Sequence, residues 1–261
     1  MKIECNEKDL APLKVRDHTD NLVVEHTLFD LPIRGLIVAR SGQGKNSILS
    51  NILMNDHYKY NKIFKGDDIY IFSPRPYDDA KMKLLIDYYE IDDNNIYAGD
   101  MPDLDSMEHV YEGLIDEFKE DNKKKPIIII DDYSSSGKFT SKFNVLVKVF
   151  CNSRKFNINI FFLSQYYNHT SPGIRNNANV LIIGNCSNKN LKTITDEHNF
   201  LENDKIFKQM FRRETLERFD FFTINYSNSA DRLYLNKNFQ AIEQAKYTTS
   251  LDRKLEAIQE E

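Results

Sequence analysis

The sequence contains few cysteines, glycines and prolines. Three Cys in 261 residues, widely spaced and without a CxxC or His-paired pattern, exclude a disulfide scaffold and a structural zinc site, so reduced thiols are expected. Nine Gly and seven Pro beside 41% hydrophobic residues exclude a collagen-like or disordered chain. We therefore expect a globular chain that buries a sizeable core, with one large domain or two small ones.

Long hydrophobic runs are also missing. The most apolar stretch, residues 126–130, is far shorter than the roughly 18 residues of a membrane-spanning helix, so no membrane partner is expected. Residues 1–10 are rich in charge and lack an apolar region, which predicts no secretory signal and an intracellular protein. The net charge of −5 argues against coating of nucleic acid by bulk electrostatics, and it leaves room for locally basic surfaces.

What the sequence does have is an alternation of short apolar runs with helical patterns. The apolar runs are β-branched or aromatic and end at Gly or Pro, and segments with apolar residues at three- and four-residue spacing follow them. This alternation predicts an α/β fold, with a mainly parallel sheet covered by helices on both faces. The predicted strands are 33–38, 68–72, 95–97, 126–131, 157–164 and 179–184, and the predicted helices are 46–57, 77–89, 104–120 and 143–151.

The two ends of the chain differ from this alternation. A strand is expected near residues 22–24, and residues 188–213 predict two short helices. Residues 219–226 and 232–235 predict a hairpin, and a polar helix is expected from residue 239. The expected divisions are an N-terminal segment over 1–30, a single α/β domain over 31–236 and a C-terminal polar helix within 237–261.

A glycine-containing loop joins the first predicted strand to the first helix. Its sequence from Ala39, ARSGQGKNS, has the Gly-x-Gly-Lys centre of a Walker A loop, although an ordinary glycine turn is the alternative. Gly42 and Gly44 permit a tight curl that turns backbone N–H groups towards nucleotide phosphates, and Lys45 adds a cation at the helix N-terminus. The expected nucleotide-binding residues are Ser41, Gly42, Gln43, Gly44, Lys45, Asn46 and Ser47.

The loop departs from the full Walker A pattern at two positions. Ala39 replaces the first glycine, and Asn46 stands where Ser or Thr normally gives a hydroxyl to Mg²⁺. Either the Asn46 amide oxygen or the Ser47 hydroxyl is then expected to reach the metal, with weaker metal binding as the result. If the metal is not held, the chain would bind nucleotide with little turnover.

The most apolar predicted strand ends in two acids. Ile127 to Ile130 lead into Asp131 and Asp132, as in a Walker B strand. Adjacent carboxylates there are costly unless a cation or a reaction uses them. Because a strand alternates its faces, we expect Asp131 to hold Mg²⁺ and Asp132 to activate the attacking water. A simple strand stop before the loop 134–137 is the alternative.

A third group of residues follows these motifs. Ser153-Arg154-Lys155 precede the strand 157–164, Gln165 closes that strand, and PGIRNNA follows at 172–178. With these motifs in this order, residues 33–184 resemble the genome-packaging ATPases of large DNA viruses, virophages and related elements. These proteins form the poxvirus A32-like branch of the FtsK/HerA superfamily.

The resemblance implies a RecA-like P-loop ATPase domain over residues 31–236. It implies a homo-oligomeric ring, a hexamer or pentamer, that uses ATP and Mg²⁺ to move double-stranded DNA into a capsid. The implied partners are the DNA and a viral capsid or portal-vertex protein, in the host cytoplasm (the viral factory) or in the virion. Weighed against this are a translocase or helicase of conjugation, replication or transposition, an assembly factor silenced by Asn46, and a small-molecule kinase, for which no arginine-rich lid is seen.

The same resemblance assigns further catalytic residues. Gln165 is the expected sensor of the γ-phosphate or the lytic water, unless it is only a satisfied amide at a strand end. Arg154 is expected to reach a neighbouring subunit's nucleotide, with Arg175 as the competing candidate, although a lone Arg is often a surface ion pair. Lys45 and Asp132 complete this set. The candidates for sequence-independent DNA contact are Lys138, Lys142, Tyr166, Tyr167 and His169.

Overall fold

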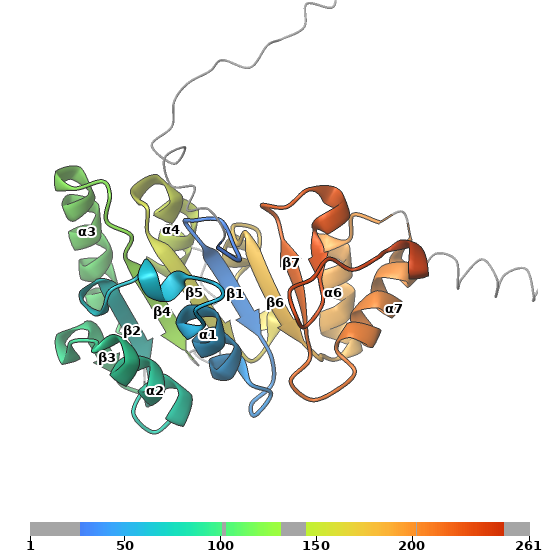
Figure 1. The fold of residues 1–261 in the computed structure, drawn as a ribbon, viewed down its shortest axis with the longest axis horizontal. Helices are drawn as coiled ribbons and strands as arrows, with labels where there is room; N and C mark the ends of the chain where they lie inside the picture. Colours follow the sequence, from blue (N-terminus) through green and yellow to red (C-terminus); the bar gives the residue numbers. More distant parts are fainter. Residues whose placement is uncertain (1–26, 101–102, 132–144, 202, 248–261) are drawn as a thin grey trace, which may run out of the picture.

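The computed structural model describes residues 27–100, 103–131, 145–201 and 203–247 (Figure 1). Eight strands form one sheet in the order β3-β2-β4-β5-β1-β6-β7-β8. All pairs up to β6 are parallel, and the pairs β6–β7 and β7–β8 are antiparallel, which confirms the mainly parallel sheet with a C-terminal hairpin. The strands are β1 Arg34–Val38, β2 Ile69–Ser73, β3 Ile96–Ala98, β4 Ile127–Asp131, β5 Asn159–Ser164, β6 Val180–Gly184, β7 Phe221–Asn225 and β8 Tyr234–Leu235.

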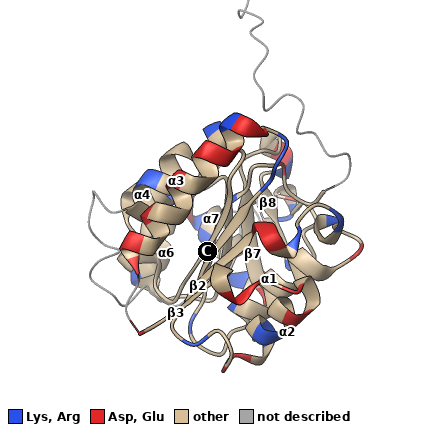
Figure 2. Ribbon diagram, turned by 90° about the vertical axis from the view of Figure 1, so that its left-hand side faces the viewer, with Lys and Arg blue, Asp and Glu red and all other residues tan. Residues whose placement is uncertain are grey.

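Helices cover both faces of the sheet (Figure 2). Neighbouring residues of one strand therefore enter two separate cores: Ile129 packs with the helices of one face and Ile130 with those of the other. Because both faces are buried, the central strands read as uninterrupted apolar runs. One face carries α1 Lys45–Met54 and α2 Ala80–Tyr89, and the other carries α3 Leu104–Glu120, α4 Val145–Asn152, α5 Pro172–Arg175, α6 Asn188–His198 and α7 Asp204–Glu214.

Most predicted elements are confirmed, with shifts at their ends. The helix predicted from residue 77 begins at Ala80, because the Asp79 side chain accepts hydrogen bonds from the N–H groups of Lys81 and Met82 and so caps the helix there. The helix predicted to reach residue 57 ends at Met54. The predicted strand near residues 22–24 lies outside the described residues.

The C-terminal helix predicted from residue 239 is wrong for residues 239–244. Ala241 forms an antiparallel bridge with Leu235, and the Ile242 N–H donates to the Tyr234 carbonyl at 2.9 Å. Ile242 and Tyr247 are buried, so apolar side chains attach this segment to the sheet. Helical backbone begins at residue 245, and residues 248–261 lie outside the described part. No helix in the described ranges has the length and apolar character needed to cross a membrane.

Candidate nucleotide-binding site

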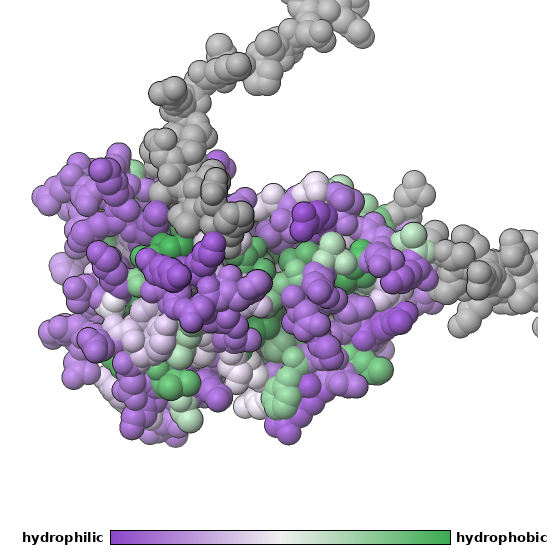
Figure 3. All heavy atoms as spheres, viewed as in Figure 1, coloured by the Kyte–Doolittle hydropathy of each residue, from purple (hydrophilic) through white to green (hydrophobic). Residues whose placement is uncertain are grey.

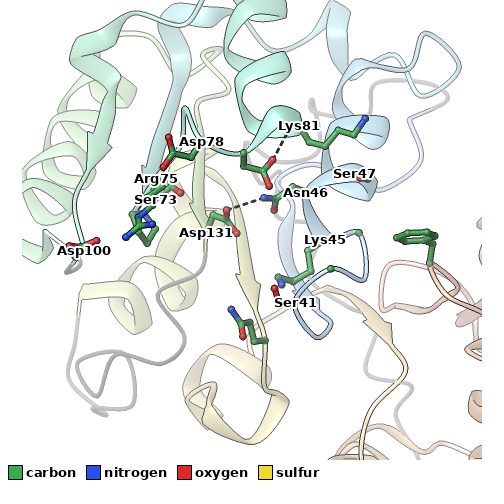
Figure 4. A pocket seen from close by; sticks show the side chains of 16 residues that line it. Ser41, Lys45, Asn46, Ser47, Ser73, Arg75, Asp78, Lys81, Asp100 and Asp131 are labelled. Carbon is green, nitrogen blue, oxygen red and sulfur yellow. Dashed lines mark hydrogen bonds between the residues drawn. The ribbon is translucent and has the colours of Figure 1, made fainter.

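The carboxyl ends of β1 to β5 surround a cavity of about 650 Å³ (Figure 4). Parallel strands of an α/β sheet place the loops that follow them at this edge, where ligands of such folds bind. The cavity brings together eight of the residues expected to bind nucleotide, metal or the reacting phosphate. These eight are Ser41, Gly42, Gly44, Lys45, Asn46, Ser47, Asp131 and Gln165, and Ser73, Pro74, Arg75, Asp78, Asp79, Lys81, Asp100 and Phe219 complete the lining.

The loop after β1 has the curl that phosphate binding requires. Gly42 and Gly44 have φ angles of 72° and 87°, in the left-handed region that favours glycine. Gly44 is the N-cap of α1, and no side chain caps the helix. The first N–H groups of α1 therefore lie at the end of the helix that borders the cavity. The buried Lys45 side chain lies across the loop, with Nζ donating to the Ala39 carbonyl at 3.1 Å.

Gln43 is the one expected nucleotide-binding residue that does not line the cavity. Its side-chain oxygen accepts a hydrogen bond from the Arg40 N–H at 3.3 Å, and its own N–H donates to the Arg40 carbonyl at 3.2 Å. Gln43 therefore closes a turn with Arg40, and phosphate binding by its backbone N–H stays a prediction.

Asn46 and Asp131, 85 residues apart in the sequence, are in contact (Figure 4). Asn46 Nδ2 donates to Asp131 Oδ2 at 3.1 Å, and the Asp131 side chain is buried. Asn46 Oδ1 is also buried and has no hydrogen-bond partner among the described residues. Leaving a buried acceptor without a partner costs about 1–3 kcal/mol, so a ligand that binds this oxygen would offset that cost.

These donors fit Mg²⁺. The Asn46 amide oxygen and the Asp131 carboxylate are hard oxygen ligands, the kind that Mg²⁺ takes. Within the described ranges no three His, Cys, Asp or Glu residues gather to form a cage of their own. Mg²⁺ is usually held by one or two protein ligands together with substrate phosphates, which matches this sparse donor set. Ser47, exposed at the cavity wall, is a further oxygen donor.

Arg154 and Arg175, the two expected arginine fingers, lie away from this cavity. Arg154 is exposed on the 3₁₀ turn Ser153–Phe156, which precedes β5 and so lies at the opposite edge of the sheet. Arg175 is buried and binds Glu197 through Nη2 and Nε at 2.5 and 3.0 Å, and its Nη1 donates to the Thr170 carbonyl at 2.8 Å. Every Arg175 nitrogen is thus engaged within the chain, and of these two arginines only Arg154 is exposed.

Tyr167 is wrong as a DNA contact because it is fully buried. Its hydroxyl donates to Glu197 at 2.6 Å and contacts His198 Nε2, and the Arg175 guanidinium lies 5.0 Å from its ring centre. Burial lowers the pKa of His198 to about 4, so this imidazole is neutral at pH 7.

By contrast, Tyr166 and His169 are exposed, with ring centres 4.8 Å apart. Asp132, Lys138 and Lys142 lie outside the described residues.

Arg75 and Phe219 line the cavity and were missed by the sequence reasoning. Arg75 did carry a signal, since it follows a strand of the parallel sheet and must emerge at the same edge as Asp131. Phe219 carried none, because its position depends on β7 pairing with β6, which no local pattern fixes.

Comparisons with known proteins agree with this geometry. The genome packaging NTPase B204 from Sulfolobus turreted icosahedral virus 2, in complex with sulfate, is 14% identical, with a TM-score of 0.53 over 75% of this chain and 92% of that chain. The AMP complex of B204 is 13% identical, with a TM-score of 0.52 over 77% of this chain and 94% of that chain. The pCW3 conjugation coupling protein TcpA with ATPγS is 18% identical, with a TM-score of 0.50 over 85% of this chain and 66% of that chain.

At these identities the solved structures establish a common P-loop NTPase fold. No curated protein matches the sequence. The family comparison goes further, because the model of the poxvirus A32 protein matches residues 23–227. That range spans both predicted nucleotide motifs and most of the described sheet, and it confirms the resemblance that those motifs carry. The chain therefore belongs to the poxvirus A32 protein family.

Proposed function

We propose that this protein is an ATPase that drives double-stranded DNA into a viral capsid. The observation that carries the proposal is the contact between Asn46 and Asp131 beside Lys45, in a chain of the A32 family. Two motifs far apart in the sequence meet in one cavity, as nucleotide hydrolysis requires. The similar fold of B204, a protein described as a genome packaging NTPase, supports the same function.

Each residue has a chemical task in hydrolysis. The curled loop and Lys45 hold the β- and γ-phosphates, while Asp131 and Asn46 Oδ1 would hold Mg²⁺. The bound ion would neutralise charge on the β/γ oxygens. Gln165 orients the attacking water, and the Asp132 carboxylate accepts a proton from it as its oxygen bonds to the γ-phosphorus and the bond to ADP breaks.

The proposal includes a homo-oligomeric ring, a hexamer or pentamer. Arg154 lies a strand's length from its own chain's cavity and is exposed, so it serves a nucleotide only if a neighbouring subunit presents one. In such a ring its planar cation stabilises charge on the transferred phosphoryl group. Mixing Arg154→Ala with Lys45→Ala subunits tests this: recovered hydrolysis supports donation between subunits, and no recovery counts against it.

DNA contact is proposed for the segment that follows the sensor. Tyr166 and His169 are exposed and come directly after Gln165, so a movement of Gln165 with the γ-phosphate would be passed to them. Such contacts to the DNA backbone would be sequence-independent. The further proposed partner is a viral capsid or portal-vertex protein, and the proposed location is the viral factory of the host cytoplasm or the virion.

Phosphate release from the purified full-length chain tests the function. With Mg²⁺ and ATP we expect hydrolysis that double-stranded DNA stimulates more than single-stranded DNA does. Asp132→Asn should bind ATP without turning it over. No phosphate release by the wild type would instead favour a nucleotide-binding assembly factor. Stimulation by single-stranded DNA alone, or DNA movement that needs no capsid, would favour a helicase or translocase of another process.

A further inference from the structure

The segment between α7 and β7, residues 215–220, lies against the phosphate loop (Figure 1). Because β7 runs antiparallel to β6, with Phe221 opposite Gly184, the residues before β7 return to the edge at which β1 ends. Arg218 joins the two loops: its Nη2 and Nε donate to the Gly42 carbonyl at 3.1 and 3.4 Å. Figure 3 shows a small hydrophobic patch at this lower edge, beside the two loops.

Phe219 is held at this place in an unfavourable backbone conformation. Its φ angle is 73°, in the left-handed region that a bulky residue rarely adopts and that costs about 1–3 kcal/mol. Two contacts of Asp220 hold the turn: its N–H donates to the Glu217 carbonyl at 3.2 Å, and Lys237 pairs with its carboxylate at 3.0 Å. Strain of this kind persists only where the surrounding structure holds the residue in place, and such residues cluster at functional sites.

In this strained conformation, Phe219 presents an exposed aromatic ring to the nucleotide cavity. Phe219 is 56% exposed and is the sole aromatic residue among the described residues that line the cavity. The Arg218 guanidinium lies 4.7 Å from the ring centre. Gly44 leaves room for the ring, because a Cβ at residue 44 would lie 3.0 Å from Phe219 Cδ1. Arg218 and Gly44 thus contact the ring, and more than half of the residue's surface stays exposed.

The sheet order places this ring at one end of the site. β4 lies on one side of β1, beyond β5, and β7 lies on the other side, beyond β6. Asp131 and Phe219 thus flank the phosphate loop from opposite sides. Asp131 and Asn46 mark the end that takes the metal and the γ-phosphate, so the ring lies at the end towards which the nucleoside extends.

We propose that Phe219 is the platform on which the nucleobase of the bound nucleotide stacks. The inference rests on the proposed function, since it requires ATP at this site. Stacking needs no hydrogen bond to the base edge, so the site accepts ATP and GTP with similar affinity and holds CTP less tightly because of its smaller ring. Arg218 is a positioning residue that orients the ring and joins it to the phosphate loop.

Calorimetric titration of the full-length chain with Mg²⁺ complexes of ATP, GTP and tripolyphosphate tests this. Phe219→Ala should weaken ATP and GTP binding on the order of tenfold and leave tripolyphosphate, which has no base, unchanged. Phe219→Tyr should restore ATP binding. Leu216→Ala is the matched control, because Leu216 lies in the same segment, is 75% exposed and does not line the cavity.

Phe219→Trp gives a direct readout of stacking, because the natural sequence contains no tryptophan and the introduced one is then the sole indole fluorophore. Its fluorescence should be quenched by ATP and GTP and not by tripolyphosphate. Equal weakening of ATP and tripolyphosphate in Phe219→Ala would overturn the inference in favour of a structural role for the turn, and unchanged ATP binding would overturn it outright. Failure of the wild type to bind either compound would overturn the proposed function as well, so the two failures are distinguishable.

Discussion

The buried polar cluster at the amino end of β6 and the nucleotide cavity at the carboxyl edge use their polar groups in different ways. At the amino end of β6, the side chains of a buried cluster bond to one another. Arg175 pairs with Glu197, Tyr167 donates to the same carboxylate, and His198 contacts the hydroxyls of Tyr167 and Tyr226. At the carboxyl edge, Asn46 keeps a buried oxygen without a described partner, and the loops around it have left-handed backbone at Gly42, Gly44 and Phe219.

This difference separates groups that stabilise the fold from groups prepared for a ligand. An unpartnered atom alone does not decide the matter, since Thr223 Oγ1 inside the sheet and three atoms near its amino edge, Arg34 Nε, Ser153 Oγ and Asn157 Oδ1, also lack a described partner. Asn46 is different because it lines a cavity, contacts a buried carboxylate and follows the phosphate loop. Mutations at the carboxyl edge should therefore reduce turnover and leave stability unchanged, and mutations in the buried cluster should do the reverse.

The largest effect on turnover is expected from Lys45→Ala. Lys45 supplies the compact cation for the β/γ oxygens, so its loss should reduce ATP hydrolysis at least about 100-fold and abolish measurable nucleotide binding. Calorimetry and phosphate release measure both quantities. Lys83→Ala, an exposed lysine of α2 outside the cavity, is the control. Unchanged ATP affinity in Lys45→Ala would remove the nucleotide assignment of this edge.

The largest effect on stability is expected at the other edge, from Arg175→Met. Removing the guanidinium leaves the partly buried Glu197 carboxylate without its cation, which should lower the free energy of unfolding by about 3 kcal/mol. For a chain of this size the melting temperature should fall by roughly 6–12 °C. Arg154→Met, at an exposed arginine, should leave the melting temperature unchanged. Loss of ATP affinity without loss of stability in Arg175→Met would reverse the comparison.

Local signals in the sequence were sufficient for much of the fold. The helix predicted at 104–120 has those bounds, because Asp103 caps it by accepting from the Ser106 N–H and its apolar residues recur on one face. The strand before Asp131 is read equally well from its run of isoleucines. The phosphate loop was found because its glycines and lysine act within a few residues of one another.

Features that depend on distant partners were missed. No local pattern reports that Arg175 meets Glu197, 22 residues further along, so it remained a candidate finger. The helix predicted from 239 failed because Ile242 gains a backbone partner on β8, and that tertiary contact overrides the polar helical pattern. Phe219 was missed for the same reason, because a phenylalanine in the sequence does not predict a left-handed turn beside another loop.

Asn46 tests whether the unpartnered oxygen at the carboxyl edge has a function. Asn46→Leu has a similar shape and lacks the oxygen, so it should raise the Mg²⁺ concentration needed for turnover at least about tenfold. Asn46→Ser restores the hydroxyl of the common Walker A pattern and should keep turnover. Hydrolysis measured over a Mg²⁺ titration gives both results. An ordinary Mg²⁺ requirement in Asn46→Leu would show that this oxygen is not a metal ligand, and Ser47 would take its place.

The smallest predicted effect is a pH dependence of stability that arises in the buried cluster. Burial lowers the pKa of His198 from 6.5 to about 4, so the unfolded chain binds a proton that the folded chain refuses between these values. This contribution to stability is complete at pH 7 and is lost as the pH falls towards 4, by about 1 kcal/mol at pH 5.5. Urea unfolding at pH 7 and 5.5 measures it. His198→Gln should be less stable at pH 7 and should lack this part of the pH slope. An equal change in the free energy of unfolding between pH 7 and 5.5 in His198→Gln and the wild type would mean that the folded chain also protonates His198 at pH 5.5. The buried cluster would then be a charged site, comparable to the carboxyl edge.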